Sequence, residues 1–211
     1  MAKSSAKSDG APPKKHPGGA HSKRWDKLLQ AAALLFAEKG YEATSMQDIA
    51  DSVGVLKGSL YHYVDSKEKI LFEIINDTFE LGVRNVGAIE AGLEPEERIR
   101  ALVDKHIDFL LNNVTTSRVL LHESAALTGE YRKIVDVQNA SYTNVFRRAI
   151  VDGQNAGVFN LDLNSDYACN FVLGACNWVY RWHDDSANVS HRQLRKQFAD
   201  MVVTALKAPQ R

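Results

Sequence analysis

The sequence is poor in cysteine and contains no long apolar run, and both absences narrow its class. Two cysteines in 211 residues fit a reduced compartment. Cys169 and Cys176 are seven positions apart, so on one helix their Cα atoms would lie about 10 Å apart, too far for an intrachain disulfide. No stretch reaches the roughly 18 apolar residues of a membrane-spanning helix, and the polar, basic N-terminal segment is unlike a secretory signal. We therefore expect a cytoplasmic protein without a membrane segment.

The usual marks of an enzyme are also missing. The sequence has no nucleophile motif and no glycine-rich phosphate-binding loop. Histidine and acidic side chains can in principle form a metal site in a helical bundle, but no Glu-x-x-His pair of the di-iron type occurs. The residues considered for such a site are His106, His122, Glu123, His183, Asp184 and Asp185. We expect neither catalysis nor a bound metal or cofactor, and a helical-bundle enzyme is the less favoured alternative.

The net charge is zero, but the charges are unevenly distributed. Residues 1–70 contain 11 Lys and Arg against 8 Asp and Glu, whereas the remainder contains 15 against 18. Residues 1–21 are rich in Lys, Ser, Gly, Pro and Ala without apolar periodicity, which predicts a disordered basic arm. A basic first third suits a polyanionic partner such as nucleic acid. The arm itself is expected either to contact DNA or to act only as a solubilising tail, and the two alternatives are equal.

Apolar residues recur at helical spacing along the rest of the chain, and no credible strand pair or internal repeat is present. The pattern predicts an all-α protein of about nine helices, the first three of them within residues 22–70. Thr44 and Ser45 are candidate N-caps of the second helix, and Thr44 with Gln47 matches a capping box, as Asp65 with Glu68 does before the fourth helix. The later helices are expected at about 66–90, 96–112, 116–127, 131–155, 165–184 and 190–207.

Residues 44–63 have the physical features of a helix-turn-helix. Ile49 and Val53 are placed to pack one short helix against the preceding one, and Gly54 can adopt the positive φ of the tight turn. The next helix begins near Lys57, and its unpaired N–H groups can face a phosphate. This helix has no Arg, Asn or Gln for the commonest bidentate base contacts, so we expect mainly electrostatic, salt-sensitive DNA binding.

Two stretches between Lys27 and Phe72 carry a more specific signal, namely LLFAEKGYEATSMQDIADSVGV and KGSLYHYVDSKEKIL. Together they resemble the DNA-binding domain of the TetR family of transcriptional regulators. After the basic arm over 1–21, the resemblance implies a DNA-binding helix-turn-helix domain over 22–70 and a helical ligand-binding and dimerisation domain over 71–211. It also implies a homodimeric repressor that binds palindromic double-stranded operator DNA and releases it when a small effector binds.

The resemblance assigns DNA contacts to residues around the turn and the recognition helix: Thr44, Lys57, Gly58, Ser59, Tyr61, His62 and Lys67. For His62, plain solvent exposure is an equal alternative, and the ring of Tyr63 is expected to close the small core. Leu56 departs from the Ser or Thr that the family usually has at this position. The hydroxyl cap of the recognition helix should therefore be absent. An effector-independent DNA-binding accessory protein is the alternative function, and activation remains open beside repression.

The penultimate helix is unusual because residues 167–180 contain no charged residue. Such a helix is expected to be covered on nearly all sides. The last helix has an apolar stripe that includes Leu194, Phe198 and Met201. Together these helices resemble the pair that forms the dimer in the TetR family, by a four-helix bundle across a two-fold axis. The alternative is a core helix of a monomer.

Two indoles and a cation gather where the penultimate helix ends. Trp178, Arg181 and Trp182 resemble a motif of TetR-type regulators that respond to acyl-CoA thioesters from lipid or steroid breakdown. Aromatic walls with one Arg suit an amphipathic anion, although interface packing with an acid partner for Arg181 is an equal alternative. The other expected ligand-binding residues, many of which would be core residues with any ligand, are Phe109, Leu110, Leu120, Leu121, Glu123, Tyr142, Phe146 and Phe171.

Overall fold

The computed structural model describes residues 20–89, 92–182 and 190–207, with side chains from residue 23 onward. Every regular element in these ranges is a helix, which confirms the all-α prediction. The helices are α1 (Ala20–Lys39), α2 (Met46–Val53), α3 (Lys57–Leu60), α4 (Lys67–Gly87), α5 (Pro95–Asn112), α6 (Val114–Glu123), α7 (Gly129–Asn155), α8 (Ser165–Asn177), α9 (Val179–Trp182) and α10 (His191–Leu206). Residues 1–19 of the predicted arm, with His183, Asp184 and Asp185, lie outside the described residues, while the last two residues of the arm belong to α1.

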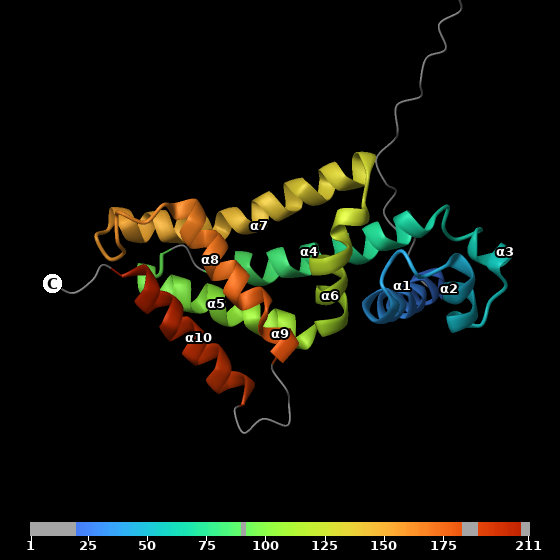
Figure 1. Ribbon diagram of the computed structural model, residues 1–211, viewed down its shortest axis with the longest axis horizontal. Helices are drawn as coiled ribbons and strands as arrows, with labels where there is room; N and C mark the ends of the chain where they lie inside the picture. Colours follow the sequence, from blue (N-terminus) through green and yellow to red (C-terminus); the bar gives the residue numbers. More distant parts are fainter. Residues whose placement is uncertain (1–19, 90–91, 183–189, 208–211) are drawn as a thin grey trace, which may run out of the picture.

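The molecule has two parts that share one long helix (Figure 1). We call α1–α3 the head and α4–α10 the body; the head lies at one end, and α4 runs from it into the body. In the body, α4, α5 and α7 pack against one another, while α6 contacts both α4 and α1. The head is therefore joined to the body through helix packing as well as through the chain.

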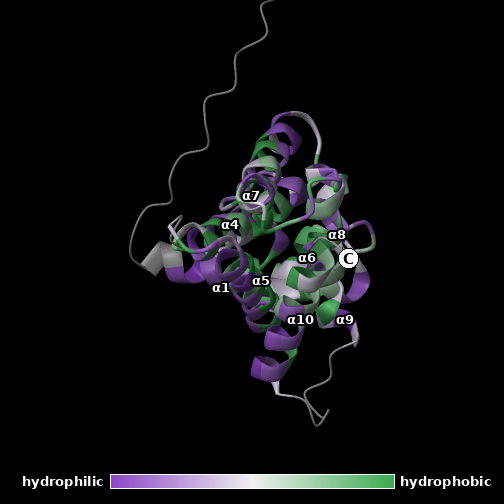
Figure 2. Ribbon diagram, turned by 90° about the vertical axis from the view of Figure 1, so that its left-hand side faces the viewer, coloured by the Kyte–Doolittle hydropathy of each residue, from purple (hydrophilic) through white to green (hydrophobic). Residues whose placement is uncertain are grey.

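Apolar packing holds the body together, and ion pairs fix its outer helix. Ile99, Leu102 and Ile107 of α5 are fully buried, and burying each such side chain stabilises the fold by roughly 1.5–3 kcal/mol. Helix α10 packs along α5, where Arg195 pairs with Asp108. Figure 2 shows hydrophobic residues concentrated between the helices and hydrophilic ones on outer turns such as those of α1 and α10. No described helix is long and apolar enough to cross a bilayer.

Both predicted capping boxes are wrong by one position. Ser45 caps α2: its hydroxyl accepts from the N–H of Asp48, and the Asp48 carboxylate accepts from the N–H of Ser45 at 2.8 Å. Ser66, and not Asp65, caps α4. Each helix begins one residue later than the Thr44 and Asp65 boxes require, since Ser followed by a helical turn supplies an equally good acceptor.

The penultimate helix is also shorter than predicted. Helix α8 ends at Asn177, and Val179–Trp182 forms a separate turn, α9. The predicted end of the helix over 131–155 is confirmed, because α7 ends at Asn155 and Gly157 then adopts a φ of 71°. The boundary predicted between residues 70 and 71 falls inside α4.

Candidate nucleic-acid interface and effector cavity

The turn of the helix-turn-helix has the predicted geometry. Gly54 adopts the left-handed conformation, with φ of 71° and ψ of 36°, and a Cβ there would be strained. Helix α3 follows as a single α-helical turn held by Leu60, which is fully buried. At the start of α3 the exposed Leu56 makes no side-chain cap, as its apolar side chain predicted.

Four of the predicted DNA-binding residues are exposed on and just after α3. Lys57, Gly58, Tyr61 and His62 face solvent, and Ser59 is half-buried. The structure thus brings these five residues together on one short segment. Tyr63 is not buried as expected but partly exposed.

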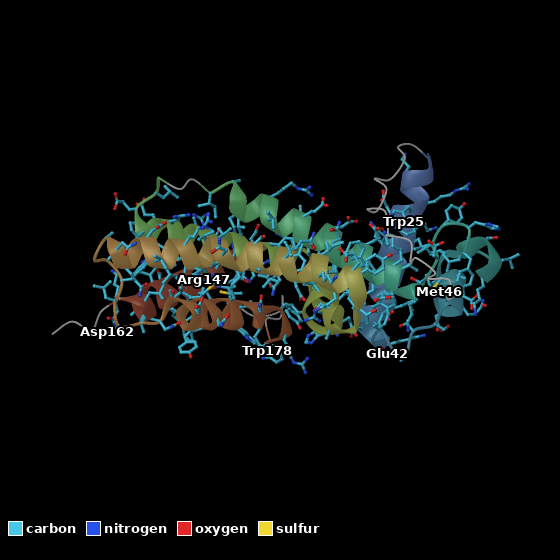
Figure 3. The ribbon with its side chains drawn as sticks, turned by 90° about the horizontal axis from the view of Figure 1, so that it is seen from above. Trp25, Glu42, Met46, Arg147, Asp162 and Trp178 are labelled. Carbon is cyan, nitrogen blue, oxygen red and sulfur yellow. The ribbon has the colours of Figure 1, made fainter. Side chains whose placement is uncertain are left out.

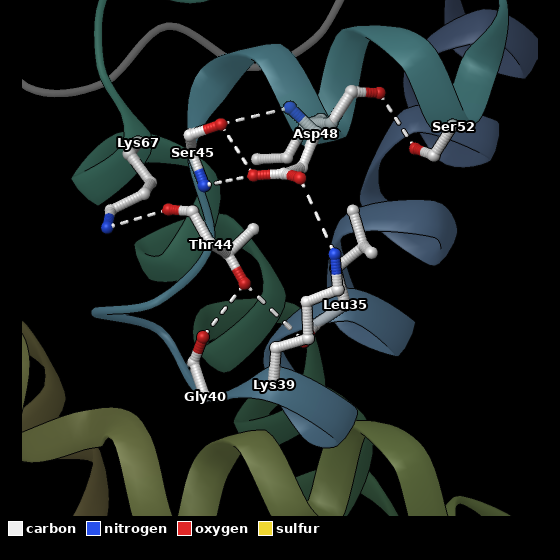
Figure 4. Close-up of polar contacts among 9 residues, drawn as sticks. Leu35, Lys39, Gly40, Thr44, Ser45, Asp48, Ser52 and Lys67 are labelled. Carbon is white, nitrogen blue, oxygen red and sulfur yellow. Dashed lines mark hydrogen bonds and ion pairs between the residues drawn. The ribbon is translucent and has the colours of Figure 1, made fainter.

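The other two predicted DNA-binding residues, Thr44 and Lys67, make polar contacts with the protein's own backbone (Figure 4). Thr44 is only 1% exposed, and its hydroxyl donates to the carbonyl of Gly40 at 2.8 Å. The Lys67 ammonium donates to the carbonyls of Tyr41 and Thr44 at 2.8 and 2.9 Å and lies 4.1 Å from the centre of the Tyr41 ring. Lys67 therefore holds the α1–α2 loop against α4, and the Thr44 hydroxyl ties this loop to the end of α1.

The start of α2 is tied to α1 by charge. Lys39 pairs with Asp48 at 3.4 Å. Hydrogen bonds from the side chain and backbone of Ser45 lower the pKa of Asp48 to about 2, and Lys39 adds to this effect. The carboxylate is thus ionised at neutral pH and suits the positive end of the α2 dipole.

A cavity of about 250 Å³ lies in the body between α4, α5, α6, α7 and α8. Its apolar walls include five of the predicted ligand-binding residues: Phe109, Leu110, Leu120, Leu121 and Tyr142. The lining also contains Thr78, Phe79 and Gly82 of α4. Helix α4 therefore both forms a wall of the cavity and carries the lysine that holds the head.

The remaining predicted ligand-binding residues lie elsewhere. Phe146 is fully buried beside the ring of His106, and Glu123 is half-buried outside the lining. Phe171, Trp178, Arg181 and Trp182 are exposed and do not line the cavity. Figure 3 shows Trp178 at the edge of the body.

The side chains of α9 and its surroundings contact one another. The Arg181 guanidinium lies 5.2 Å from the centre of the Trp178 ring. Trp182 stacks on Phe198 of α10 with ring centres 5.8 Å apart. These contacts fit packing at a surface more directly than a ligand cavity.

The sequence-based prediction did not include the polar residues on one side of the cavity. Arg132, Asp136 and Asn139 of α7 all line it, and Arg132 pairs with Asp136 at 2.8 Å. Their spacing of four and three residues places them on one helix face, which is the signal that could have found them. Among the described lining residues, Arg132 brings the permanent positive charge that Arg181 was expected to supply.

The deep part of the cavity contains a buried hydrogen-bonded network. His106 Nδ1 lies 2.7 Å from the Tyr142 hydroxyl, and its Nε2 lies 3.0 Å from the side-chain amide oxygen of Asn177. Burial lowers the pKa of His106 to about 4, outweighing the opposite effect of the Asn177 hydrogen bond. The imidazole is therefore neutral at pH 7. These three residues come from α5, α7 and α8, so the network ties three walls together.

The first turn of α4 also caps α7. The carboxylate of Glu68 accepts from the backbone N–H and the hydroxyl of Thr128, at 2.7 and 2.8 Å. Thr128 is the N-cap residue of α7, and its own side chain makes no cap. Glu68, next to Lys67, thus connects the first turn of α4, which holds the head, to α7, which carries the polar side of the cavity.

One face of the α8–α10 region is apolar and exposed in the single chain. Tyr167 and Phe171 are 77% and 57% exposed, and they stand four residues apart on α8. Trp178, which directly follows α8, and Met201 of α10 are also exposed. The charge-free helix is thus not covered on all sides by its own chain, and the monomer-core alternative does not account for this face.

The chain matches two family models. Residues 28–74 match the model of bacterial regulatory proteins, tetR family, and residues 92–206 match the tetracyclin repressor-like C-terminal domain. The second match covers more than half of the chain.

Relatives with known roles extend along most of the chain. It is 28% identical over 202 residues to the HTH-type transcriptional repressor KstR2 of Rhodococcus jostii, covering 94% of this chain and 98% of that protein. The crystal structure of AibR in complex with isovaleryl coenzyme A and operator DNA is 29% identical, with a TM-score of 0.76 over 87% of this chain and 97% of AibR. A TetR/AcrR-family transcriptional regulator of Thermobifida fusca is 32% identical, with a TM-score of 0.64 over 88% of this chain and all of that one.

Proposed function

Because the chain belongs to the TetR family of bacterial regulatory proteins, we propose that it is a transcriptional repressor that leaves its operator on binding a small effector. The observation that carries this proposal is the double role of α4. Its first turn holds the α1–α2 loop through Lys67, and its middle lines the cavity through Thr78, Phe79 and Gly82. An effector that favours one position of α4 therefore changes the placement of α2 and α3. Such a protein acts in the bacterial cytoplasm, where the chromosome lies.

The repressor works as a homodimer on palindromic DNA. The exposed apolar face around Tyr167, Phe171 and Met201 is suited to a second copy of the chain, which buries it across a two-fold axis. Two α3 segments then meet successive major-groove faces about 34 Å apart.

The DNA contacts are assigned to the exposed segment at α3. Lys57 meets phosphate, and Gly58, Ser59, Tyr61 and His62 lie against the groove and backbone. Thr44 and Lys67 act by holding the loop that positions α2. Because this segment has no Arg, Asn or Gln for bidentate base contacts, much of the affinity comes from the basic charge.

The effector is an acyl-CoA thioester whose acyl part enters the cavity. AibR, a structural relative, was crystallised with isovaleryl coenzyme A and operator DNA, so this class of ligand is compatible with the fold. An apolar cavity of about 150 Å³ holds a benzene molecule. The 250 Å³ cavity here therefore suits an acyl group of one or two rings or a short branched chain, with the CoA part outside. Arg132 offers its charge to the polar end of such a ligand.

Fluorescence anisotropy with labelled DNA from upstream of the gene tests this function. We expect tight binding that one class of acyl-CoA thioester reverses and that free coenzyme A leaves intact. Tyr61→Ala should lose DNA binding while still binding the thioester in calorimetry. Tight DNA binding that no thioester disturbs would reject the effector class, and a protein that selects no DNA site from a genomic library would reject the repressor.

A further inference from the structure

The deep end of the cavity is built differently from an apolar acyl pocket. Most of its wall is apolar, with Phe79, Phe109 and Leu173 among the lining residues. Against this wall stand the Tyr142 hydroxyl and the Asn177 amide, both in the lining and both bonded to His106. A pocket for a plain hydrocarbon gains nothing from polar groups at this depth.

The hydrogen-bonding capacity of this network is incomplete. The His106 Nε2–H donates to the carbonyl oxygen of Asn177, so the neutral ring accepts at Nδ1 from the Tyr142 hydroxyl. The Tyr142 oxygen then keeps lone pairs that can accept. The amino group of Asn177 finds no acceptor among the residues that the structure describes. One acceptor and one donor therefore remain beside the same cavity.

The neutral state of His106 fixes this arrangement. With a pKa lowered to about 4 by burial, the ring does not take up a second proton at pH 7 and cannot reverse the direction of the Tyr142 hydrogen bond. The ring of Tyr142 also packs closely on Gly82, where a Cβ would lie 3.3 Å from Tyr142 Cε2. The acceptor therefore has a set position and a set polarity.

We propose that this cavity selects an effector whose inner end bears a hydroxyl group, which donates to the free lone pair of the Tyr142 oxygen. The inference rests on the proposed function, since it names the chemistry of the acyl part of the effector. A hydroxyl group of the effector supplies the donor that the Tyr142 oxygen can still accept. A hydrocarbon of the same size fills the cavity without supplying this donor, which costs roughly tenfold in affinity.

Two small molecules of nearly equal size, phenol and toluene, probe the cavity without DNA or coenzyme A. Calorimetry of the full chain should give at least about tenfold tighter binding for phenol than for toluene, although toluene is the more hydrophobic. Tyr142→Phe should remove most of this preference by weakening phenol alone. The matched control Leu120→Met alters the apolar wall and should keep the preference. Leu121→Trp, which fills the cavity, should abolish the binding of both.

The outcomes separate this inference from the repressor itself. Equal binding of phenol and toluene, or binding of neither at millimolar concentration, would overturn the hydroxyl subsite. So would a Tyr142→Phe protein that binds operator normally and keeps the full preference for phenol. None of these results alters operator binding or its reversal by thioesters. Conversely, a phenol preference in a protein that no thioester releases from DNA would retain the subsite and reject the thioester.

Discussion

The head and the body place their polar groups in opposite ways. Around α3 the head exposes Lys57, Tyr61 and His62 on a segment that its own chain does not cover. The body instead encloses His106 and Tyr142 among packed helices. A polyanion is met at an open surface by charge, whereas a small molecule is distinguished inside a cavity, where an unsatisfied polar group is costly. Changes in the two regions should therefore alter different measurements.

Two glycines test this difference most strongly. A Cβ on Gly153 of α7 would lie 2.1 Å from Cδ2 of Phe159, whereas one on Gly58 of α3 would meet nothing within 4 Å. Gly153→Ala should lower the free energy of unfolding by about 3 kcal/mol in urea titration, because the ring must move within a packed core. Gly58→Ala should leave stability unchanged or raise it by up to about 1 kcal/mol, and should weaken operator binding. Equal stability losses would contradict the contrast.

The pH dependence of stability should come from the body. Because the folded pKa of His106, about 4, is below the unfolded value of 6.5, the unfolded chain binds a proton that the folded chain excludes between these values. This group should thus remove about 1.4 kcal/mol of stability per unit as pH falls from 6.5 toward 4. Urea titrations of His106→Gln should show a flatter profile. Ile107→Val, which is destabilising but not titratable, should keep the wild-type slope.

Removing a positive charge from the head should affect DNA binding and leave effector binding unchanged. Lys57→Ala should weaken operator binding about tenfold and reduce the slope of log affinity against log salt by about 0.9, the effect of one lost phosphate contact. Thioester binding in calorimetry should not change. Lys133→Ala, which removes an exposed charge from α7 in the body, is the matched control and should leave the salt slope intact. An unaltered slope for Lys57→Ala would remove this residue from the DNA surface.

The smallest effect is expected where the regions meet. Glu68→Gln keeps an acceptor for Thr128 but loses the charge, so about 0.5–1 kcal/mol of that contact should be lost. Operator affinity without effector should stay within about twofold, while the thioester concentration needed for release should shift by up to about fivefold. Anisotropy titrations measure both values. If neither moves, α7 does not take part in the coupling.

Local patterns in the sequence predicted the head well. Gly54 and the missing cap at Leu56 were correctly predicted because turn and cap chemistry involves residues a few positions apart. The same chemistry failed by one residue at Thr44 and at Asp65, where a neighbouring serine makes the cap instead. Periodicity also predicted the helices of the body, but not the break at the end of α8.

The cavity could be predicted only in part. Five of its lining residues were found because aromatic and aliphatic side chains on these helices are common in such cavities, but Phe79, Val135 and Leu173 were not predicted. The network was missed because His106 meets Tyr142 and Asn177 across 36 and 71 positions of the chain, which no local pattern records. Phe171 and Trp178 were placed at the ligand because a charge-free helix does not reveal which of its faces is turned outward.

The adjacency of Lys67 and Glu68 has a consequence for protein engineering. Lys67 anchors the α1–α2 loop, and Glu68 anchors the start of α7. If a chimera is joined after residue 70, both anchoring residues come with the DNA-binding segment. A chimera that takes its DNA-reading segment from a relative therefore also imports the partner of Thr128. Grafts that preserve an acid at position 68 should inherit the effector response, and those that do not should read the new DNA site but answer the ligand weakly.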